Sequence, residues 1–344
     1  MIIFLVIFLG LTLYKVKFSN FHEDYIGRGQ SGSIKGFFAI IIFFSHVRQY
    51  IALSNTFLDF GFSLFLSALG QLIVTLFFFY SGYGIIQSYK AKRDYSKDFF
   101  KKRIVKTWLH FALVVLLYLI LSFIVKSDYS WFDYAFAWIG WTSIGNSNWF
   151  VFVMLALYLI TQIAFLLVKK NNPLAVVVIV CVLSCALFFL LYFTGKETWW
   201  MDTLFCYVLG MGYACVEKRL TGIMKKSKLC NYGLIVLCGI AFLVSYIFLN
   251  QLLPKRVAGN VTAIFFCLFV VLTLTKVKID NPILRWLGKY SFYIYICQRL
   301  PMITLSAIGL SNNAIFLFVS LILTLGISVL FNFLFTKLDK VLFK

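Results

Sequence analysis

Apolar runs long enough to cross a lipid bilayer recur along the whole sequence, and they restrict the folds that the chain can adopt. A helix needs about 20 apolar residues to cross a hydrocarbon core ~30 Å thick. The runs, each ended by a short polar segment, cover residues 2–14, 34–53, 62–88, 104–125, 148–168, 174–194, 199–216, 230–252, 257–275, 286–309 and 313–336. They predict an all-α, polytopic membrane helix bundle of about ten core transmembrane helices plus one N-terminal helix.

The composition excludes a soluble domain and leaves one large membrane domain. Hydrophobic residues make up 62% and charged residues 13% of the chain, with a mean hydropathy of +0.93, whereas soluble domains are about half apolar and a quarter charged. Residues 1–33 are expected to form an N-terminal transmembrane helix and a cytoplasmic loop, 34–336 the membrane domain and 337–344 a cytoplasmic tail. The first run lacks a basic leading segment and a small-residue cleavage site, which favours an uncleaved helix.

The basic residues are distributed unevenly between the loops. Of 32 Lys and Arg residues, 26 lie in alternate loops and four in the others. Because cytoplasmic loops are enriched in Lys and Arg, this pattern predicts an external N-terminus and a cytoplasmic C-terminus. The net charge of +20 therefore reflects membrane topology, and nucleic acid is not an expected partner.

The eight cysteines lie inside or at the ends of apolar runs, and no C-x-x-C pair or histidine cluster accompanies them. Neither a disulfide framework nor a metal site is predicted. No phosphate-binding glycine loop, dinucleotide fingerprint or zinc-protease motif is present either, so no bound cofactor is expected.

Lys35 lies at the start of the second run, and His46 follows it 11 residues later in the same run. Eleven helical residues return to nearly the same face and rise roughly 16 Å. A cation thus stands at the cytoplasmic surface with an imidazole near mid-membrane above it. This spacing suits a donor with phosphates at the surface and a reactive end inside, with His46 as general base or nucleophile. In the alternative interpretation, Lys35 is a lysine at the membrane surface and His46 is a structural histidine of the core.

Five segments resemble acyltransferase family 3, whose members are polytopic membrane proteins that acylate cell-surface carbohydrates. They are 34–47 (IKGFFAIIIFFSHV), 77–84 (FFFYSGYG), 99–108 (FFKKRIVKTW), 148–158 (NWFVFVMLALY) and 287–301 (LGKYSFYIYICQRLP). The resemblance implies that His46 is catalytic, that Lys35, Arg103 and Lys106 bind the donor, and that Ser81, Trp149 and Gln298 line the pocket. The chain departs from the family pattern in having Lys35 and Lys106 in place of Arg, and Gln298 where many members have His.

Arg48 and Arg299 belong to neither set of loops, because both fall within apolar runs. Guanidinium groups inside a membrane usually face a cavity or a partner. We expect both to line an external, water-filled vestibule near His46 that takes an acidic or hydroxyl-rich acceptor, with Asp202 as the nearby acid. In the alternative interpretation, one arginine reaches the outer surface and the other pairs structurally.

The external segment 127–147 is rich in Trp, Tyr and Phe. Such a segment forms either an interfacial aromatic belt or a platform on which sugar rings stack. The sequence leaves both open.

Together these features predict an enzyme of the bacterial plasma membrane. It would move an acyl group, expected to be acetyl, from cytoplasmic acyl-CoA as co-substrate to a hydroxyl of a cell-surface polysaccharide or its lipid-linked precursor. Membrane lipid, the carbohydrate acceptor, acyl-CoA and the machinery of glycan assembly are the expected partners. The alternative is a polytopic transporter or flippase for a glycan or small solute, which explains the many helices but not the Lys35–His46 spacing.

Overall fold

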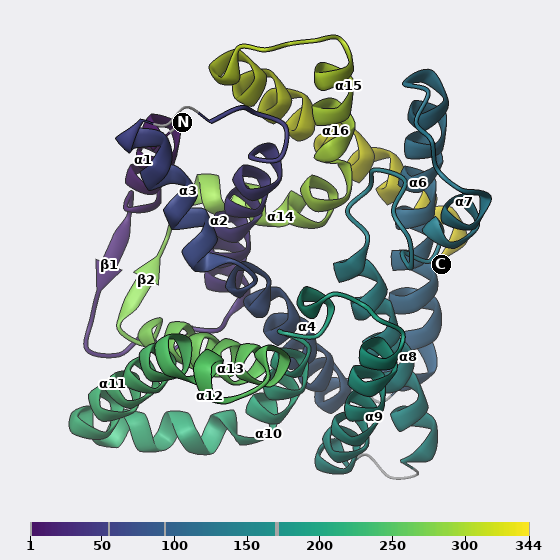
Figure 1. Cartoon of the computed structure of the whole chain (residues 1–344). Helices are drawn as coiled ribbons and strands as arrows, with labels where there is room; N and C mark the ends of the chain where they lie inside the picture. Colours follow the sequence, from purple (N-terminus) through teal and green to yellow (C-terminus); the bar gives the residue numbers. More distant parts are fainter. Residues whose placement is uncertain (1, 54–55, 93, 169–171, 344) are drawn as a thin grey trace.

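Helices make up most of the computed structural model, which describes residues 2–53, 56–92, 94–168 and 172–343 (Figure 1). The first half contains α1 (Ile2–Thr12), α2 (Arg28–Val47), α3 (Phe57–Leu69), α4 (Leu72–Ala91), α5 (Tyr95–Phe99), the π-helix η1 (Phe100–Val105), α6 (Lys106–Ile124), α7 (Trp131–Ala137) and α8 (Trp149–Leu167). The second half contains α9 (Pro173–Phe193), η2 (Thr198–Trp200), α10 (Phe205–Lys226), α11 (Lys228–Val244), η3 (Ser245–Leu249), α12 (Asn250–Leu252), α13 (Lys255–Thr273), α14 (Pro282–Cys297), α15 (Arg299–Ala307) and α16 (Asn313–Leu342). The predicted all-α class is confirmed.

Within the described residues, seven helical segments are long and apolar enough to cross a membrane. They are Asp59–Ala91, Tyr95–Ile124, Trp149–Leu167, Pro173–Phe193, Lys228–Leu249, Lys255–Thr273 and Asn313–Leu342. The other expected crossings correspond to α1, α2, α10 and the α14–α15 pair, which are shorter, broken or more polar.

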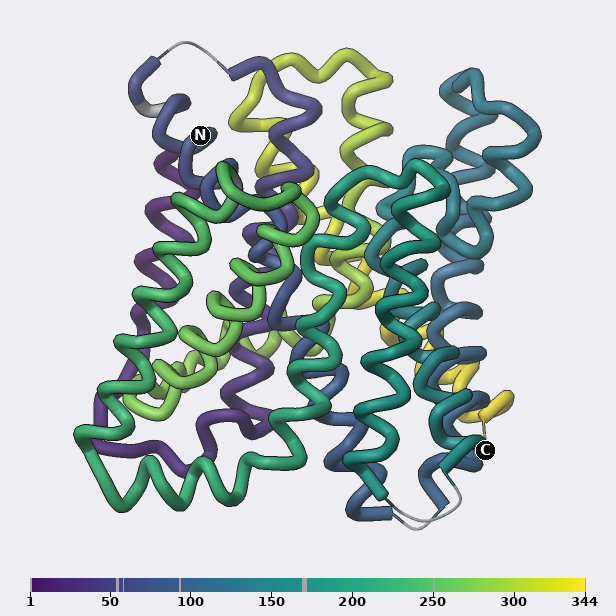
Figure 2. The backbone as a smooth tube through the Cα atoms, turned by 60° about the horizontal axis from the view of Figure 1, so that its bottom comes forward, coloured from purple at the N-terminus to yellow at the C-terminus, as the bar shows by residue number. Residues whose placement is uncertain are grey.

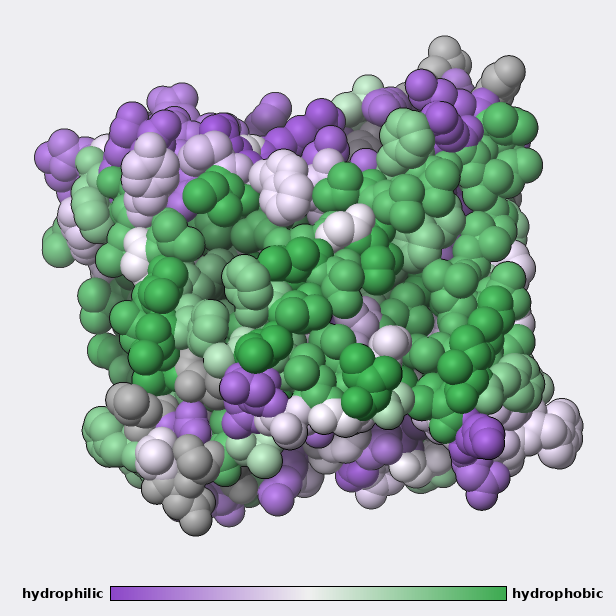
Figure 3. All heavy atoms as spheres, turned by 90° about the horizontal axis from the view of Figure 1, so that it is seen from above, coloured by the Kyte–Doolittle hydropathy of each residue, from purple (hydrophilic) through white to green (hydrophobic). Residues whose placement is uncertain are grey.

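The surface seen in Figure 3 has an apolar belt between two polar bands, as a bilayer requires. Figure 2 shows the α10–α11 turn at the lower end of the molecule and the α15–α16 connection at the upper end. The chain is thus suited to a multi-pass membrane protein. Which end faces the cytoplasm stays a prediction from the charge count, and four of the counted residues (Arg93, Lys169, Lys170 and Lys344) lie outside the described residues.

Three predicted spans are wrong in detail because the helices break or end earlier. The run 62–88 is two helices, α3 and α4, separated at Gly70, whose φ of +44° ends the first. The run 286–309 divides at Gln298 into α14 and α15. The helix predicted over 34–53 ends at Val47, so Arg48 is its C-cap and not an internal residue.

Glycines allow two pairs of core helices to touch at backbone level. A Cβ on Gly36 of α2 would lie 1.9 Å from the carbonyl oxygen of Leu284 in α14. A Cβ on Gly288 of α14 would lie 1.9 Å from the carbonyl oxygen of Gly32 in α2. The α4–α10 pair is equally close, since a Cβ on Gly82 would lie 2.1 Å from the oxygen of Tyr207. Small residues are what permit such close packing in a membrane, where van der Waals contact supplies much of the association energy.

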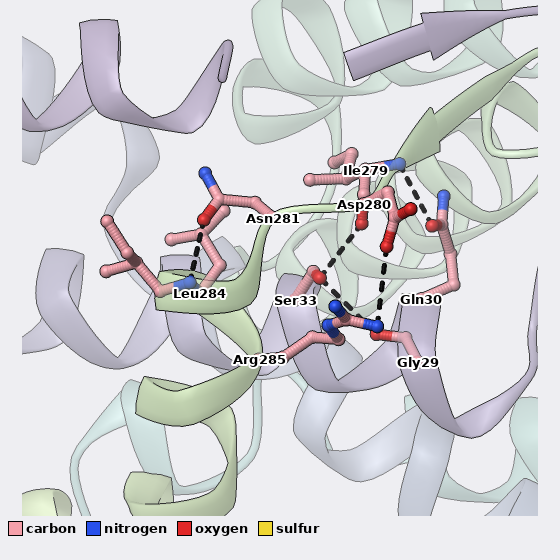
Figure 4. A network of polar contacts seen from close by, with 9 residues as sticks. Gly29, Gln30, Ser33, Ile279, Asp280, Asn281, Leu284 and Arg285 are labelled. Atoms are coloured by element: carbon pink, nitrogen blue, oxygen red, sulfur yellow. Dashed lines mark hydrogen bonds and ion pairs between the residues drawn. The ribbon is translucent and has the colours of Figure 1, made fainter. Parts of the chain in front are cut away.

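A polar junction fixes the start of α2 to the segment that leads into α14 (Figure 4). The strand β1 (Val16–Phe18) pairs antiparallel with β2 (Val277–Ile279). The Ser33 hydroxyl donates to the Ile279 carbonyl at 2.9 Å, and the Gln30 side chain accepts from the Ile279 N–H at 3.0 Å. An ion pair of 3.3 Å joins Arg285 to Asp280 beside them. These strands were not predicted, because two three-residue segments 261 residues apart carry no local pattern.

Candidate active site

His46 lies in the last turn of α2, where the sequence IIIFF anchors the helix in the interior. Ile41, Phe43 and Val47 are completely buried, so the position of the last turn is fixed. The imidazole is partly exposed, whereas its Nδ1 atom is buried and has no hydrogen-bond partner among the described residues. Neither ring nitrogen of His46 forms a hydrogen bond with the described residues, so the imidazole is available to accept a proton.

An aromatic row covers one side of His46. The Tyr295 ring of α14 meets the imidazole edge-on, with centroids 6.3 Å apart. Phe150 of α8 packs on Tyr295 at 5.3 Å, and Trp149 on Phe150 at 5.9 Å. Trp149 therefore belongs to this wall through Phe150.

Arg299 is the charged neighbour of His46. Its guanidinium donates to the Gln49 side chain and lies over the Tyr50 ring, 5.8 Å from the centroid. It also lines a cavity of about 380 Å³. We call it the outer cavity because the distribution of Lys and Arg predicts that this side of the protein faces outward. The other lining residues are Tyr50, Tyr118, Leu121, Ser122, Val125, Ser127, Tyr129, Ser143, Ile144, Gly145 and Ile303. Five of them come from the aromatic segment 127–147, which thus forms part of the wall.

Arg48 does not line this cavity. Its Nη1 atom donates to the Ser63 carbonyl at 3.1 Å and to the Ser67 hydroxyl at 2.8 Å, both on α3. Asp202 packs against Gly259 of α13 and has Arg256 as its charged neighbour. The expectation that the two arginines and Asp202 share one vestibule is therefore wrong for Arg48 and Asp202, because the short α3 and the early end of α2 hold Arg48 elsewhere.

Gln298 is completely buried between α14 and α15. Its Nε2 atom donates to the Tyr295 carbonyl at 3.1 Å, and its Oε1 atom has no partner among the described residues. The side-chain amide of Gln298 therefore stabilises the end of α14 by bonding the backbone of Tyr295, the residue that contacts His46.

Lys35 and Arg103 come together at the other end of α2. Lys35 is partly exposed, and its charged neighbour is Arg103 of η1. Arg103 in turn lies near Tyr158 of α8, whose hydroxyl makes a 2.9 Å hydrogen bond with Ser81 of α4. Neither cation forms an ion pair with an acid in the described part of the chain, and two like charges held close together in this way are suited to a polyanion. Ser81 thus belongs with the two cations, not with the outer cavity.

Lys106 points away from this pair toward α16. Its ammonium lies 2.6 Å from Asp339, and the other oxygen of that carboxylate lies 2.9 Å from Nε2 of His110. Lys102, Lys106, Asp339 and Lys340 line a second cavity of about 690 Å³ together with Thr336 and Phe343. The structure therefore brings Lys35 and Arg103 together, while Lys106 is already paired.

Sequence reasoning missed Tyr295, Tyr158 and the His110–Asp339 pair. The only signal for Tyr295 is its place three residues before Gln298, within the last of the five motif segments. Asp339 lies in the range assigned to a tail, yet α16 continues through it to Leu342. These partners are contacts between distant segments, which no local pattern reveals.

Comparison with protein families gives one match that covers nearly the whole chain. The model described as "Acyltransferase domain", that of acyltransferase family 3, matches residues 33–333. Comparison with curated proteins and with solved structures finds no significant match. The match includes most of α2, with Lys35 and His46, as well as α14 and Arg299. The chain belongs to acyltransferase family 3 and is a membrane acyltransferase.

Proposed function

We propose that this acyltransferase moves an acetyl group from cytoplasmic acetyl-CoA to a hydroxyl of a cell-surface polysaccharide or its lipid-linked precursor, in the bacterial plasma membrane. The observation that carries the proposal is the position of Lys35 and His46 on one unbroken helix. Arg103 lies beside Lys35, and the outer cavity reaches the neighbourhood of His46 through Arg299. Family membership makes the chain an acyltransferase, so the transporter alternative is set aside.

The donor is assigned to the Lys35 end of α2. Lys35 and Arg103 would hold its phosphates, since ammonium and guanidinium groups form strong charge-assisted hydrogen bonds with phosphate oxygens. Lys106, for which the resemblance implied the same role, is left out of this assignment because its ammonium is paired with Asp339 in the wall of the 690 Å³ cavity. From Lys35, α2 leads the reactive end of the donor over roughly 16 Å to His46.

His46 is assigned the proton transfer. Its imidazole would take the proton of the acceptor hydroxyl while the hydroxyl oxygen attacks the thioester carbonyl. As the new C–O bond forms and the C–S bond breaks, the leaving thiolate takes the proton from the imidazolium. The same residue could instead carry the acetyl group as an acyl-histidine between two half-reactions, and the geometry fits either route.

The test is reconstitution of the full-length protein in lipid nanodiscs with isotope-labelled acetyl-CoA and glycans extracted from the producing cells. Mass analysis should find labelled O-acetyl groups with wild type and none with His46→Ala. His22→Ala is the matched control, because His22 lies outside the site and its backbone N–H bonds Thr275 near β2. Labelled glycan that forms equally with His46→Ala would refute the assignment.

A further inference from the structure

The outer cavity has the size and surface of a sugar site. Its volume of about 380 Å³ falls within the roughly 300–1,000 Å³ that small-molecule sites occupy. Tyr50, Tyr118 and Tyr129 supply rings and phenolic hydroxyls, and three serines supply further hydroxyls. Aromatic faces together with hydroxyl groups match the C–H faces and hydroxyls of a carbohydrate.

The charge in this cavity is one-sided. Arg299 is its single cation, and no carboxylate is among its lining residues. Asp133 interacts electrostatically with Tyr129 of the cavity wall. Its carboxylate is already engaged in the capping box of α7, where it accepts a hydrogen bond from the Ser130 hydroxyl at 2.7 Å. A guanidinium that is partly withdrawn from water loses hydration energy, and an anion bound in the cavity would offset that loss.

Arg299 also keeps hydrogen-bonding capacity unused. The guanidinium donates to the side chains of Gln49 and Tyr50, while its buried Nε has no partner among the described residues. The guanidinium makes no ion pair with any acid in the described ranges. Its planar fork, with five donors, fits a carboxylate in a bidentate geometry.

From this geometry we infer that the acceptor is an acidic glycan and that Arg299 binds a uronate carboxylate next to the sugar that receives the acyl group. One guanidinium matches the single charge of a carboxylate, whereas a phosphate monoester would call for a second cation. The inference rests on the proposed function and adds the substrate class to it. Arg299 is then a specificity residue, and its place beside His46 sets the uronate next to the reacting hydroxyl.

Arg48 provides a matched control on the same side of the molecule. It follows His46 by two residues, yet its guanidinium donates to Ser63 and Ser67 of α3 and does not line the cavity. Removal of its charge should change stability but not acceptor preference.

The experiment measures binding of oligogalacturonate and of its neutral methyl ester to the full-length protein in nanodiscs, without donor. Wild type should bind the acid form about 10- to 150-fold more tightly, the effect of one charge-assisted contact. Arg299→Gln should abolish the difference, Arg299→Lys should retain part of it, and Arg48→Gln should keep it. In wild type, adding salt to about 0.5 M should weaken the binding of the acid form and leave the binding of the ester unchanged. If Arg299→Gln does not fold, this salt dependence in wild type tests the inference.

Equal affinity for the two forms in wild type overturns the inference, as does a preference that survives Arg299→Gln. Acyl transfer is assayed separately, so failure of the inferred acidic acceptor can be distinguished from failure of the proposed function. Transfer to glycans with equal binding of acid and ester refutes the acidic acceptor alone. A clear preference for the acid without any transfer from acetyl-CoA refutes the proposed function alone.

Discussion

The rings of Tyr295 and His46 form a T-shaped pair, with the ring centroids 6.3 Å apart and the planes at 84°. The two residues come from α2 and α14, which touch at backbone level near Gly36 and Gly288. The orientation of the imidazole is therefore set by a contact between helices made early and late in the chain. Its buried Nδ1 lacks a hydrogen-bond partner among the described residues, so packing, not hydrogen bonding, holds the ring.

His46→Ala is expected to reduce the turnover number about 10²- to 10⁴-fold, the usual contribution of a positioned acid–base group. Initial rates of CoA release and of O-acetyl transfer by the purified variant provide the measurement. Residual activity of more than a few per cent would exclude both the base and the carrier role.

Lys35→Glu should raise the KM for acetyl-CoA strongly, because a carboxylate at this position repels the phosphates that Lys35 and Arg103 attract. Lys35→Arg should retain donor binding, since the charge is kept. Lys17→Glu in β1 is the control, because it reverses the charge of an exposed lysine outside the site. Unchanged donor affinity in Lys35→Glu would mean that this lysine only sets membrane topology.

Gly36→Ala should lower the stability of the fold by about 1–3 kcal/mol, the typical cost of overpacking, since its Cβ would lie 1.9 Å from the Leu284 oxygen. Gly29→Ala on the same helix has nothing within 4 Å and should be neutral or slightly stabilising. Thermal unfolding in detergent compares the two. Equal melting temperatures would contradict the backbone contact between α2 and α14.

Asp339→Asn should loosen α16 from α6, because it removes the charge that Lys106 and His110 share. The pair is only partly exposed, with 38% of the Lys106 side chain and 16% of the Asp339 side chain accessible, and loss of a charged hydrogen-bond partner there costs about 1–3 kcal/mol. Asp98→Asn breaks the exposed Lys102 pair and should cost under ~1 kcal/mol. Similar melting temperatures for the two variants would show that Asp339 adds no stability.

The sequence predicted the helices well where a long apolar run coincides with one helix, as in α8, α9 and α13. It failed at Gly70 and Gln298, because hydropathy measures average apolarity and not the backbone angles at which a helix breaks. It placed Lys35 and His46 on one helix, since spacing within a helix is a local property. It could not assign Arg48 and Arg299 to different surroundings, because that depends on which neighbouring helix offers hydroxyl groups.

The contact between α2 and α14 has a consequence for biosynthesis. The glycine face of α2 leaves the ribosome early, whereas its partner Gly288 is made only after most of the other helices. Until then β1 has no strand to pair with, and Tyr295 is not present to orient His46. A chain whose synthesis stops before α14 therefore cannot assemble this site.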